Sequence, residues 1–549
     1  MKGELEKPQR SIKNLFFSGV LVLAVANFLV KAVGLISKIA LNRVVGSVGA
    51  GYYSSAYEIY AYLYVLSTAG LPVALSIMIS KSRSKGRLLE AKKTLNIAIM
   101  LFLVIGFSFS LIMIVFSHQL ASFIGAPETF LCIITIAPTM LFICLSSCMR
   151  GYLQGYQLMT PTAISQFIEA VCKVGIGVSL ALWARSRGYA DYVVASYTIL
   201  GVTCGVFLGM VFLYIRKAFF KESLYLPSNT VASTEAKSTK SLLKEMLLIA
   251  VPITLSSSVL SLTTVLDTLM VQNRLLKFGM NEVGVRIFYG DYTSLVISMF
   301  TLPTILLYPI ANAIVPIITT ARERKNKEYE ARLRTLSIKM IALISIPCAV
   351  GLSIFSKPIL ELLMFKTDSV ERAHPWLSIA SISVIFLGII SITNAFLNSA
   401  GKQRLPIISM LAGAITKLVS NYILLAKIGI LGAPISTVLC YFVASGMNLF
   451  FVVKKVGDLP KIGRVFLAPF LCSFISIGAC AILQRALAQI ILPKIATVIS
   501  IIVSILSYLI IILRTKTLSK EEISVLPSSD KLIKSLIKFK ILPKNSENI

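Results

Sequence analysis

Residues 26–46 read ANFLVKAVGLISKIALNRVVG, an apolar run that is interrupted by two lysines. If the run is helical, one side of the helix carries polar or small residues, namely Asn27, Lys31, Gly34, Lys38 and Asn42. The opposite side of the helix is aliphatic. A charged side chain near the middle of a bilayer costs about 2.5–3.5 kcal/mol on insertion scales. The pattern therefore predicts a membrane-spanning helix whose polar stripe faces a water-filled cavity, where both ammonium groups are available to an anion. Lys38 lies nearer the outer end, where its ammonium could instead reach the membrane interface.

The composition is that of a polytopic membrane protein. Of the 549 residues 56% are hydrophobic, the mean hydropathy is +0.83, and only 14% are charged, against roughly 25% in soluble domains. The nine cysteines lie mostly in apolar runs, without a Cys-x-x-Cys pair, and the chain has two histidines. We interpret the cysteines as small buried hydrophobic residues, and we expect no metal, disulfide or cofactor.

Apolar segments of about twenty residues, the length that crosses a bilayer, recur along the whole chain. Fourteen such spans are predicted, so that the expected fold is all-α. The predicted spans are 16–41, 56–80, 94–116, 129–149, 161–183, 193–215, 243–268, 291–318, 336–356, 376–400, 406–426, 431–453, 465–490 and 493–513. Several contain proline, which a helix bundle tolerates because neighbouring groups satisfy the freed carbonyls.

The net charge of +30 is distributed unevenly around these spans. With the N-terminus in the cytoplasm, 38 of the 54 Lys and Arg residues fall on the cytoplasmic side, 12 fall outside and 4 lie within spans. This asymmetry follows the positive-inside rule. It predicts a multi-pass protein of the cytoplasmic membrane with both termini inside, and it leaves no reason to expect nucleic acid as a partner.

A fixed shift of 244 positions aligns the two halves of the chain. RGYLQGYQ (150–157) then lies on NAFLNSAG (394–401). The sequence therefore predicts two pseudo-symmetric six-helix lobes, related by an axis along the membrane normal, with the substrate site between them. The predicted parts are an N-terminal lobe at 1–220, a cytoplasmic linker at 221–242, a C-terminal lobe at 243–455, two further helices at 456–514 and a basic cytoplasmic tail at 515–549. The tail is either an amphipathic helix on the inner leaflet or a soluble segment.

Two charged residues of the first lobe and one of the second lie well inside predicted spans. Glu169 and Lys173 are spaced i,i+4, which favours an ion pair inside the first lobe. A role of this pair in coupling or in substrate contact remains an alternative. Lys417 takes the place of Lys173 in the second lobe, without an acidic residue four positions before it.

Other charged residues lie near span ends, on helices that are expected to line the cleft between the lobes. Glu58, Asp267 and Asp291 are candidate gating or ion-coupling groups. Arg286 belongs to the longest outer loop, 269–290, and is either a guide for a substrate phosphate or a solvated loop charge.

Several stretches resemble one known superfamily. LVKAVGLISKIALNRVVGSVGAGYYSSAYEIY (29–60), RGYLQGYQLMTPTAISQFIEAVCKV (150–174) and GILGAPISTVLCY (429–441) are similar to segments of the multidrug/oligosaccharidyl-lipid/polysaccharide flippase superfamily. The resemblance covers about residues 10–515. It looks closest to the Gram-positive branch that holds the MurJ-type lipid II flippases and the stage V sporulation protein B group.

The resemblance implies a V-shaped bundle in which spans 1, 2, 7 and 8 line a cationic cavity. It also implies that the last two spans form a groove for a polyprenyl tail. Members of the Gram-negative type carry Arg-x-x-Gly-x-x-Arg-Asp in the first helix, where this chain has Lys31, Gly34, Ser37 and Lys38. The positive sign of the cavity is thus kept, although individual contacts cannot be transferred.

The function expected from this resemblance is that of a flippase for a polyprenyl-pyrophosphate-linked cell-wall precursor, most simply lipid II, in peptidoglycan synthesis and cell shape. The partners would be the anionic pyrophosphate headgroup, membrane lipids and cell-wall synthesis proteins, and the carrier would be a monomer. The substrate-binding candidates are Lys31, Lys38, Asn27, Asn42 and Arg286. The chain has no P-loop and no GxSxG elbow, so we do not expect an enzyme.

Three alternatives remain open from the sequence. A flippase for another polysaccharide or for a sporulation-specific precursor would have the same features. A cation-coupled drug antiporter would favour acidic cavities over the lysines of the first span. A membrane-embedded transferase would need an outer catalytic carboxylate, for which Asp368 and Glu371 are weak candidates.

Overall fold

The computed structural model describes residues 33–34, 40, 42–220, 237–323, 327–364, 367–460 and 462–515. These residues are almost entirely helical and contain no strand, so the expected all-α membrane fold is confirmed. Among them, ten helical segments are long and apolar enough to cross a membrane, or eleven if the bent pair Asp368–Ala380 and Ser383–Ser399 is one span. The number of fourteen stays a prediction, because part of the chain lies outside the described residues and because long segments such as residues 404–455, which hold two predicted spans, count here as one.

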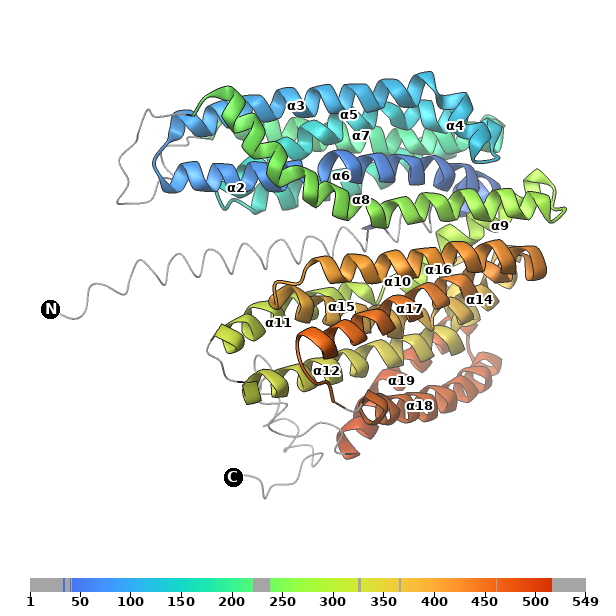
Figure 1. Ribbon diagram of the computed structural model, residues 1–549. Coiled ribbons are helices and arrows are strands. Elements are labelled where there is room, and N and C mark those ends of the chain that lie inside the picture. The colour runs from blue at the N-terminus through green and yellow to red at the C-terminus, as the bar shows by residue number, and fades with distance from the viewer. Residues whose placement is uncertain are drawn as a thin grey trace. The chain divides into compact units, whose positions relative to one another are not determined.

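The chain divides into two compact units, and the division falls between Ser294 and Leu295. Unit 1 contains a helix over residues 42–68, followed by eight labelled α-helices (Figure 1). These are α2 (Leu71–Ser84), α3 (Leu88–Val115), α4 (Ser117–Phe123), α5 (Phe130–Gly155), α6 (Thr160–Ser186), α7 (Asp191–Ala218), α8 (Thr239–Lys277) and α9 (Glu282–Asp291). The predicted linker at 221–242 lies mostly outside the described residues, so the predicted lobe boundaries stay predictions.

The long helices of unit 1 pack side by side. α7 lies against both α5 and α6, α3 lies against α5, and α8 runs along α2 and α3 (Figure 1). Two apolar cores result. One gathers the helix over residues 42–68 with the first half of α5, and the other gathers α2 with the second half of α5 and the start of α8. Charged side chains that lie between these helices are therefore held by a rigid frame.

The helix over residues 42–68 begins earlier than the predicted second span, 56–80. Residues 42–55 are helical as well, although Asn42, Arg43 and three serines make this stretch less apolar than a typical span. The reason is close packing against α9: a Cβ added at Gly51 would lie 2.5 Å from the carbonyl oxygen of Arg286, and one added at Gly290 would lie 2.0 Å from that of Ser47. Two glycines thus let the backbones approach, as small residues do between membrane helices.

This span is broken before α2, at residues 69–70, where Pro72 lies in the first turn of the next helix. Gly70 fits closely against α8, since an added Cβ would lie 2.0 Å from the carbonyl oxygen of Ala250. Proline at the start of α2 is favourable, because its missing N–H would have no partner there. The break is therefore fixed both by the local sequence and by the neighbouring helix.

Unit 2 begins within a short π-helix, Tyr292–Ile297. The helices that follow are α10 (Ser298–Thr301), α11 (Thr304–Glu323), α12 (Lys327–Ile354), α13 (Ser356–Met364), α14 (Asp368–Ala380), α15 (Ser383–Ser399), α16 (Arg404–Ile428), α17 (Gly432–Lys455), α18 (Ile462–Ile490) and α19 (Pro493–Arg514) (Figure 1). The predicted span 376–400 is divided at Ser381, where α14 and α15 meet at 42°.

Glycine and serine organise the second half of unit 2. Gly429, with φ of +59°, separates α16 from α17, which pack against each other. Between α18 and α19 the Ser476 hydroxyl lies 2.5 Å from that of Ser507, and Tyr508 donates to the carbonyl of Leu343 in α12 at 2.9 Å. The last two helices are thus bonded to each other and to α12.

The contact between the helix over residues 42–68 and α9 can be tested with one methyl group. Gly290→Ala should lower the free energy of unfolding by about 1–3 kcal/mol, because the new Cβ overlaps the Ser47 carbonyl. Gly175→Ala in α6 is the matched control, since a Cβ there meets nothing within 4 Å and alanine favours the helix. The midpoint of thermal unfolding in detergent measures both. Equal stability of the two variants would contradict the close approach.

Candidate functional site

The polar stripe of the first predicted span falls mainly outside the described residues. Asn27, Lys31 and Lys38 belong to that part of the chain, so their cavity stays a prediction. Asn42 is described and is buried, with 4% of its surface exposed, and its Nδ2 donates to the Ser294 hydroxyl at 2.7 Å. The end of the predicted stripe is therefore anchored next to the π-helix that follows α9.

Asp291 lies in the same contact region. Its side chain is fully buried, and it accepts a hydrogen bond of 2.5 Å from the Ser47 hydroxyl. Asn42 and Asp291, two candidates from distant parts of the sequence, thus lie in the same helix–helix contact. Asn42 bonds to Ser294 across this contact, and Ser47 bonds to Asp291. Single π-helical turns occur frequently at functional sites, and this one begins directly after the buried aspartate.

Arg286 differs from its prediction as an outer-loop residue. The expected loop at 269–290 is wrong, because α8 continues to Lys277 and α9 begins at Glu282. The Arg286 side chain is 1% exposed and donates to the side-chain oxygen of Gln272 and to the carbonyl of Gly125. Its guanidinium also lies 5.7 Å from the ring centroid of Tyr52. A buried cation needs such partners, and binding of a phosphate by Arg286 would require them to open.

The contacts of Arg286 extend to a wider polar cluster. Gln272 donates to the Ser55 hydroxyl at 2.9 Å, and Tyr52 donates to Glu128 at 2.8 Å. The cluster therefore links α8, α9, the helix over residues 42–68 and the turn before α5. None of these partners was predicted, because each is an ordinary polar residue whose role depends on a helix far away in the sequence.

The structure places two of the predicted gating residues on helices but does not test their role in gating. Glu58 lies on the helix over residues 42–68 with a partly buried side chain. Asp267 lies within α8, and its side chain is outside the description. Their function in gating or ion coupling stays a prediction.

The i,i+4 spacing predicted an ion pair between Glu169 and Lys173, but Glu169 pairs with another residue. Arg150 at the end of α5 forms an ion pair with Glu169 of α6, and its Nε donates to the Ser165 hydroxyl at 3.1 Å. The two side chains of the ion pair are 8% and 16% exposed. The guanidinium can bind two groups one helical turn apart, which explains why an arginine from the neighbouring helix takes the place of Lys173. Arg150 directly follows the predicted span 129–149, and no role was predicted for it.

Lys173 instead lies over aromatic rings. Its ammonium is 4.7 Å from the ring centroid of Tyr57 and 6.0 Å from that of Tyr53. These rings begin a ladder along one helix, in which Tyr53, Tyr57, Tyr60 and Tyr64 follow with centroids 5.6–6.1 Å apart. A cation over a tyrosine face is stabilised by the ring quadrupole. The spacing of these tyrosines, at every third or fourth position, was a sequence signal that could have identified the ladder.

Lys417 occupies a corresponding place in unit 2. Lys173 follows the first residue of α6, Thr160, by 13 positions, and Lys417 follows the first residue of α16, Arg404, by the same number. Both lysines are partly buried. The shift of 244 positions that aligns the sequence halves thus also aligns these two helix starts.

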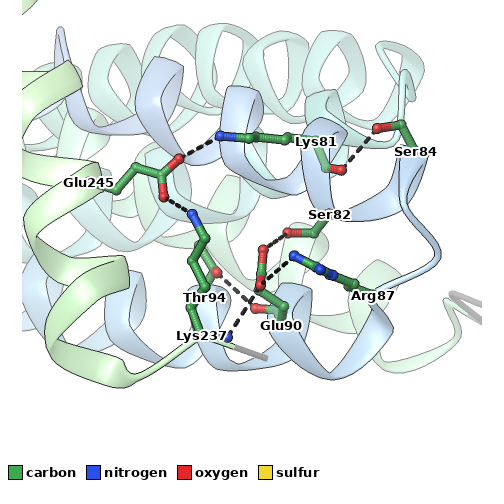
Figure 2. A network of polar contacts seen from close by, with 8 residues as sticks. All are labelled: Lys81, Ser82, Ser84, Arg87, Glu90, Thr94, Lys237 and Glu245. Carbon is green, nitrogen blue, oxygen red and sulfur yellow. Dashed lines mark hydrogen bonds and ion pairs between the residues drawn. The ribbon is translucent and has the colours of Figure 1, made fainter. Parts of the chain in front are cut away.

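A further network lies where α2, α3 and α8 meet (Figure 2). Glu245 accepts hydrogen bonds from the ammonium groups of Lys81 at 2.9 Å and Lys237 at 2.5 Å. Glu90, which is 5% exposed, accepts from the Ser82 hydroxyl at 2.9 Å and from the backbone N–H of Lys237 at 3.3 Å. The hydrogen bond to Glu245 raises the pKa of Lys237. The start of α8 is therefore fastened to the α2–α3 turn.

Unit 2 contains a similar arrangement. Glu330, near the start of α12, is 7% exposed and lies 2.8 Å from both Arg322 and Arg334. The positive-inside rule treats these segments only as positive charge, so the buried glutamates were not predicted. Acidic residues within the otherwise basic segments 81–93 and 322–334 were the available signal.

The described helices are those of a multi-pass membrane protein. The model of the family described as "Polysaccharide biosynthesis protein" matches residues 16–322. The chain therefore belongs to this family, within the multidrug/oligosaccharidyl-lipid/polysaccharide flippase superfamily. A second family model, MatE, matches residues 252–423.

Curated relatives from Bacillus subtilis (strain 168) align with most of the chain. The "Uncharacterized membrane protein YabM" is 24% identical, over 95% of this chain and 97% of its own length. "Stage V sporulation protein B" is 23% identical, over 95% and 99%. "Lipid II flippase MurJ" is 24% identical, over 80% and 82%.

Solved structures of similar fold include a lipid II flippase. "Lipid II flippase MurJ, inward closed conformation" superimposes with a TM-score of 0.68 at 17% identity, over 89% of this chain and 98% of that one. At this identity the likeness establishes the fold alone. The likeness agrees with the expected all-α membrane fold and does not identify the substrate.

The buried ion pair in unit 1 predicts an asymmetric response to substitution. Glu169→Leu should lower the free energy of unfolding by about 3–5 kcal/mol, because it leaves the Arg150 guanidinium buried and unpaired. Adding Arg150→Met should recover most of this loss, since no charge then remains. Thermal unfolding in detergent is the measurement.

The exposed pair of Arg185 and Asp191, which are 54% and 38% exposed, provides the control for this experiment. Asp191→Asn should change stability by less than about 1 kcal/mol, because water screens the pair. If Glu169→Leu is as mild as this control, the pair with Arg150 does not contribute to stability as described.

Proposed function

We propose that the protein is a flippase that moves a polyprenyl-pyrophosphate-linked cell-wall precursor, lipid II in the first place, across the cytoplasmic membrane. The observation that carries the proposal is the predicted first span, 16–41, which holds Lys31 and Lys38 and no acidic residue. An ammonium group is a point charge that suits a phosphate oxygen. Such a span fits an anionic guest and not a cationic drug.

The relatives add independent support for this substrate class. The lipid II flippase and the stage V sporulation protein have similar identity to the chain, at 24% and 23%. Transport of a sporulation-specific or other polysaccharide precursor is therefore the second candidate. The MatE match over 252–423 is the reason to retain a drug antiporter as the third, although the lysines of the first span disfavour it.

The proposed cycle is alternating access between lobes 1–220 and 243–455. Lys31 and Lys38 attract the pyrophosphate from the cytoplasmic side, with Asn27 and Asn42 on the same face. The polyprenyl chain stays in lipid along the two helices of 456–514. With both termini inside the cell, an inside-negative potential favours outward movement of an anionic headgroup by about 2.3 kcal/mol per charge for each 100 mV.

The support for a duplicated carrier comes from within each unit. Lys173 and Lys417 follow the starts of α6 and α16 by equal distances, in agreement with the shift of 244 positions between the sequence halves. Parallel repeats of this type build their substrate site near the bilayer midplane. The basic tail at 515–549 would then face the inner leaflet.

Depletion in the host tests the proposed substrate. In cells without another lipid II flippase, depletion should raise the amount of lipid II on the inner leaflet severalfold and should deform the cell. Lys31→Ala should fail to restore translocation, whereas Lys31→Arg, which keeps the charge, should restore most of it. The measurement is the fraction of lipid II that is accessible from outside in cells with equal amounts of each variant.

Two results would change this assignment. Normal translocation of lipid II in the depleted cells would remove lipid II as the substrate. A defect that appears only during spore formation would favour the sporulation-specific precursor. A Lys31→Ala protein that works as well as the parent would remove the role of the first-span cation.

A further inference from the structure

Lys173 is a cation in the middle of a span that the transport proposal does not yet use. Thirteen residues separate it from each end of α6, Thr160–Ser186, which at 1.5 Å per residue puts it about 20 Å from both. It therefore lies near half the depth of the membrane. At this depth a lysine is too far from either interface to reach water easily by extending its side chain.

The surroundings of Lys173 leave its charge uncompensated. The nearest acidic residue on its helix face, Glu169, is already paired with Arg150. Among the described residues the Lys173 ammonium lies 4.7 and 6.0 Å from the ring centroids of Tyr57 and Tyr53, and both phenols are also within hydrogen-bonding reach of it. Rings stabilise a cation without neutralising it. Arg150, Glu169 and Lys173 together thus carry a net charge of +1 inside unit 1.

The side chain is also not sealed within unit 1. Lys173 is partly exposed, as is Tyr57, whereas Tyr53 and Tyr60 are buried at 6% and 5% exposure. An ammonium group open to lipid at this depth would cost about 2.5–3.5 kcal/mol. The open side of Lys173 is therefore better explained by an aqueous space or by a ligand than by acyl chains.

We infer that Lys173, seated on Tyr53 and Tyr57, forms an anion-binding subsite at mid-membrane depth that receives an anionic group of the transported molecule. The inference rests on the proposed function. It adds a contact separate from the first-span lysines Lys31 and Lys38. The phenol rings hold the ammonium in place, and the Arg150–Glu169 pair keeps the nearest carboxylate from neutralising it. The anion is a phosphate or a carboxylate, both of which an ammonium group binds by charge-assisted hydrogen bonds.

Binding to the full-length protein in nanodiscs tests the subsite with three probes. Undecaprenol is neutral, undecaprenyl pyrophosphate carries only phosphates, and lipid II carries phosphates and peptide carboxylates. Lys173→Met should weaken the binding of at least one anionic probe about tenfold, and should leave undecaprenol binding unchanged. Loss for both anionic probes identifies phosphate as the partner, and loss for lipid II alone identifies carboxylate.

Matched variants separate charge from folding. Lys173→Arg should keep affinity within about threefold, and Lys173→Gln, a second neutral variant, should repeat the loss seen with methionine. Lys93→Met removes an exposed lysine at the start of α3 and should change nothing. The thermal midpoint of each variant, measured in the same nanodiscs, identifies any variant that fails to fold.

The outcomes for the subsite and for the proposed function are distinct. If the parent prefers an anionic probe over undecaprenol and both neutral variants keep that preference, the subsite is overturned while the flippase proposal stands. If the parent binds all three probes equally, the lipid-linked pyrophosphate proposal fails, and the subsite fails with it.

Discussion

A charge inside a membrane must have a partner or face water, and the interior of unit 1 is arranged around this constraint. Arg150 is neutralised by Glu169 and further bound by Ser165. Arg286 lies among neutral acceptors, Gln272 and the Gly125 carbonyl, with a tyrosine ring beside it. In each case the guanidinium group, with its five N–H donors, binds groups from other parts of the chain. The contacts that stabilise these buried cations therefore also hold the helices together.

Such contacts require helices that approach closely. In a membrane, lipid tails are as apolar as leucine, so that small residues and hydrogen bonds replace much of the usual hydrophobic drive for packing. Gly51 and Gly290 bring the helix over residues 42–68 against α9, and only at that distance can short hydroxyl side chains such as Ser47 and Ser294 bridge the gap. The buried position of Asp291 thus follows from two glycines. Larger residues at those positions would separate the polar groups as well as the backbones.

The sequence predicted the parts of this structure that depend on local composition. The all-α class and the apolar segments follow from hydropathy. Asn42 and Asp291 attract notice as polar residues where they are costly, and both are buried, although their roles in binding and gating stay predictions. The partners did not follow, since Glu169 has Lys173 one turn away but bonds to Arg150 on α5. The helix over residues 42–55 was missed for a related reason, because its burial comes from contact with α9 and not from its own hydropathy.

The turns between helices carry more information than their charge. The positive-inside rule accounts for the lysines and arginines of 81–93 and 322–334, but it gives no reason for a buried glutamate in each segment. Glu90 and Glu330 both lie within the first four residues of a helix, where a carboxylate is favoured by the helix dipole, and both bind side chains from the helix before the turn. In each unit the carboxylate thus fastens the start of one helix to the end of the helix before it, because Glu90 of α3 accepts from Ser82 of α2 and Glu330 of α12 pairs with Arg322 of α11.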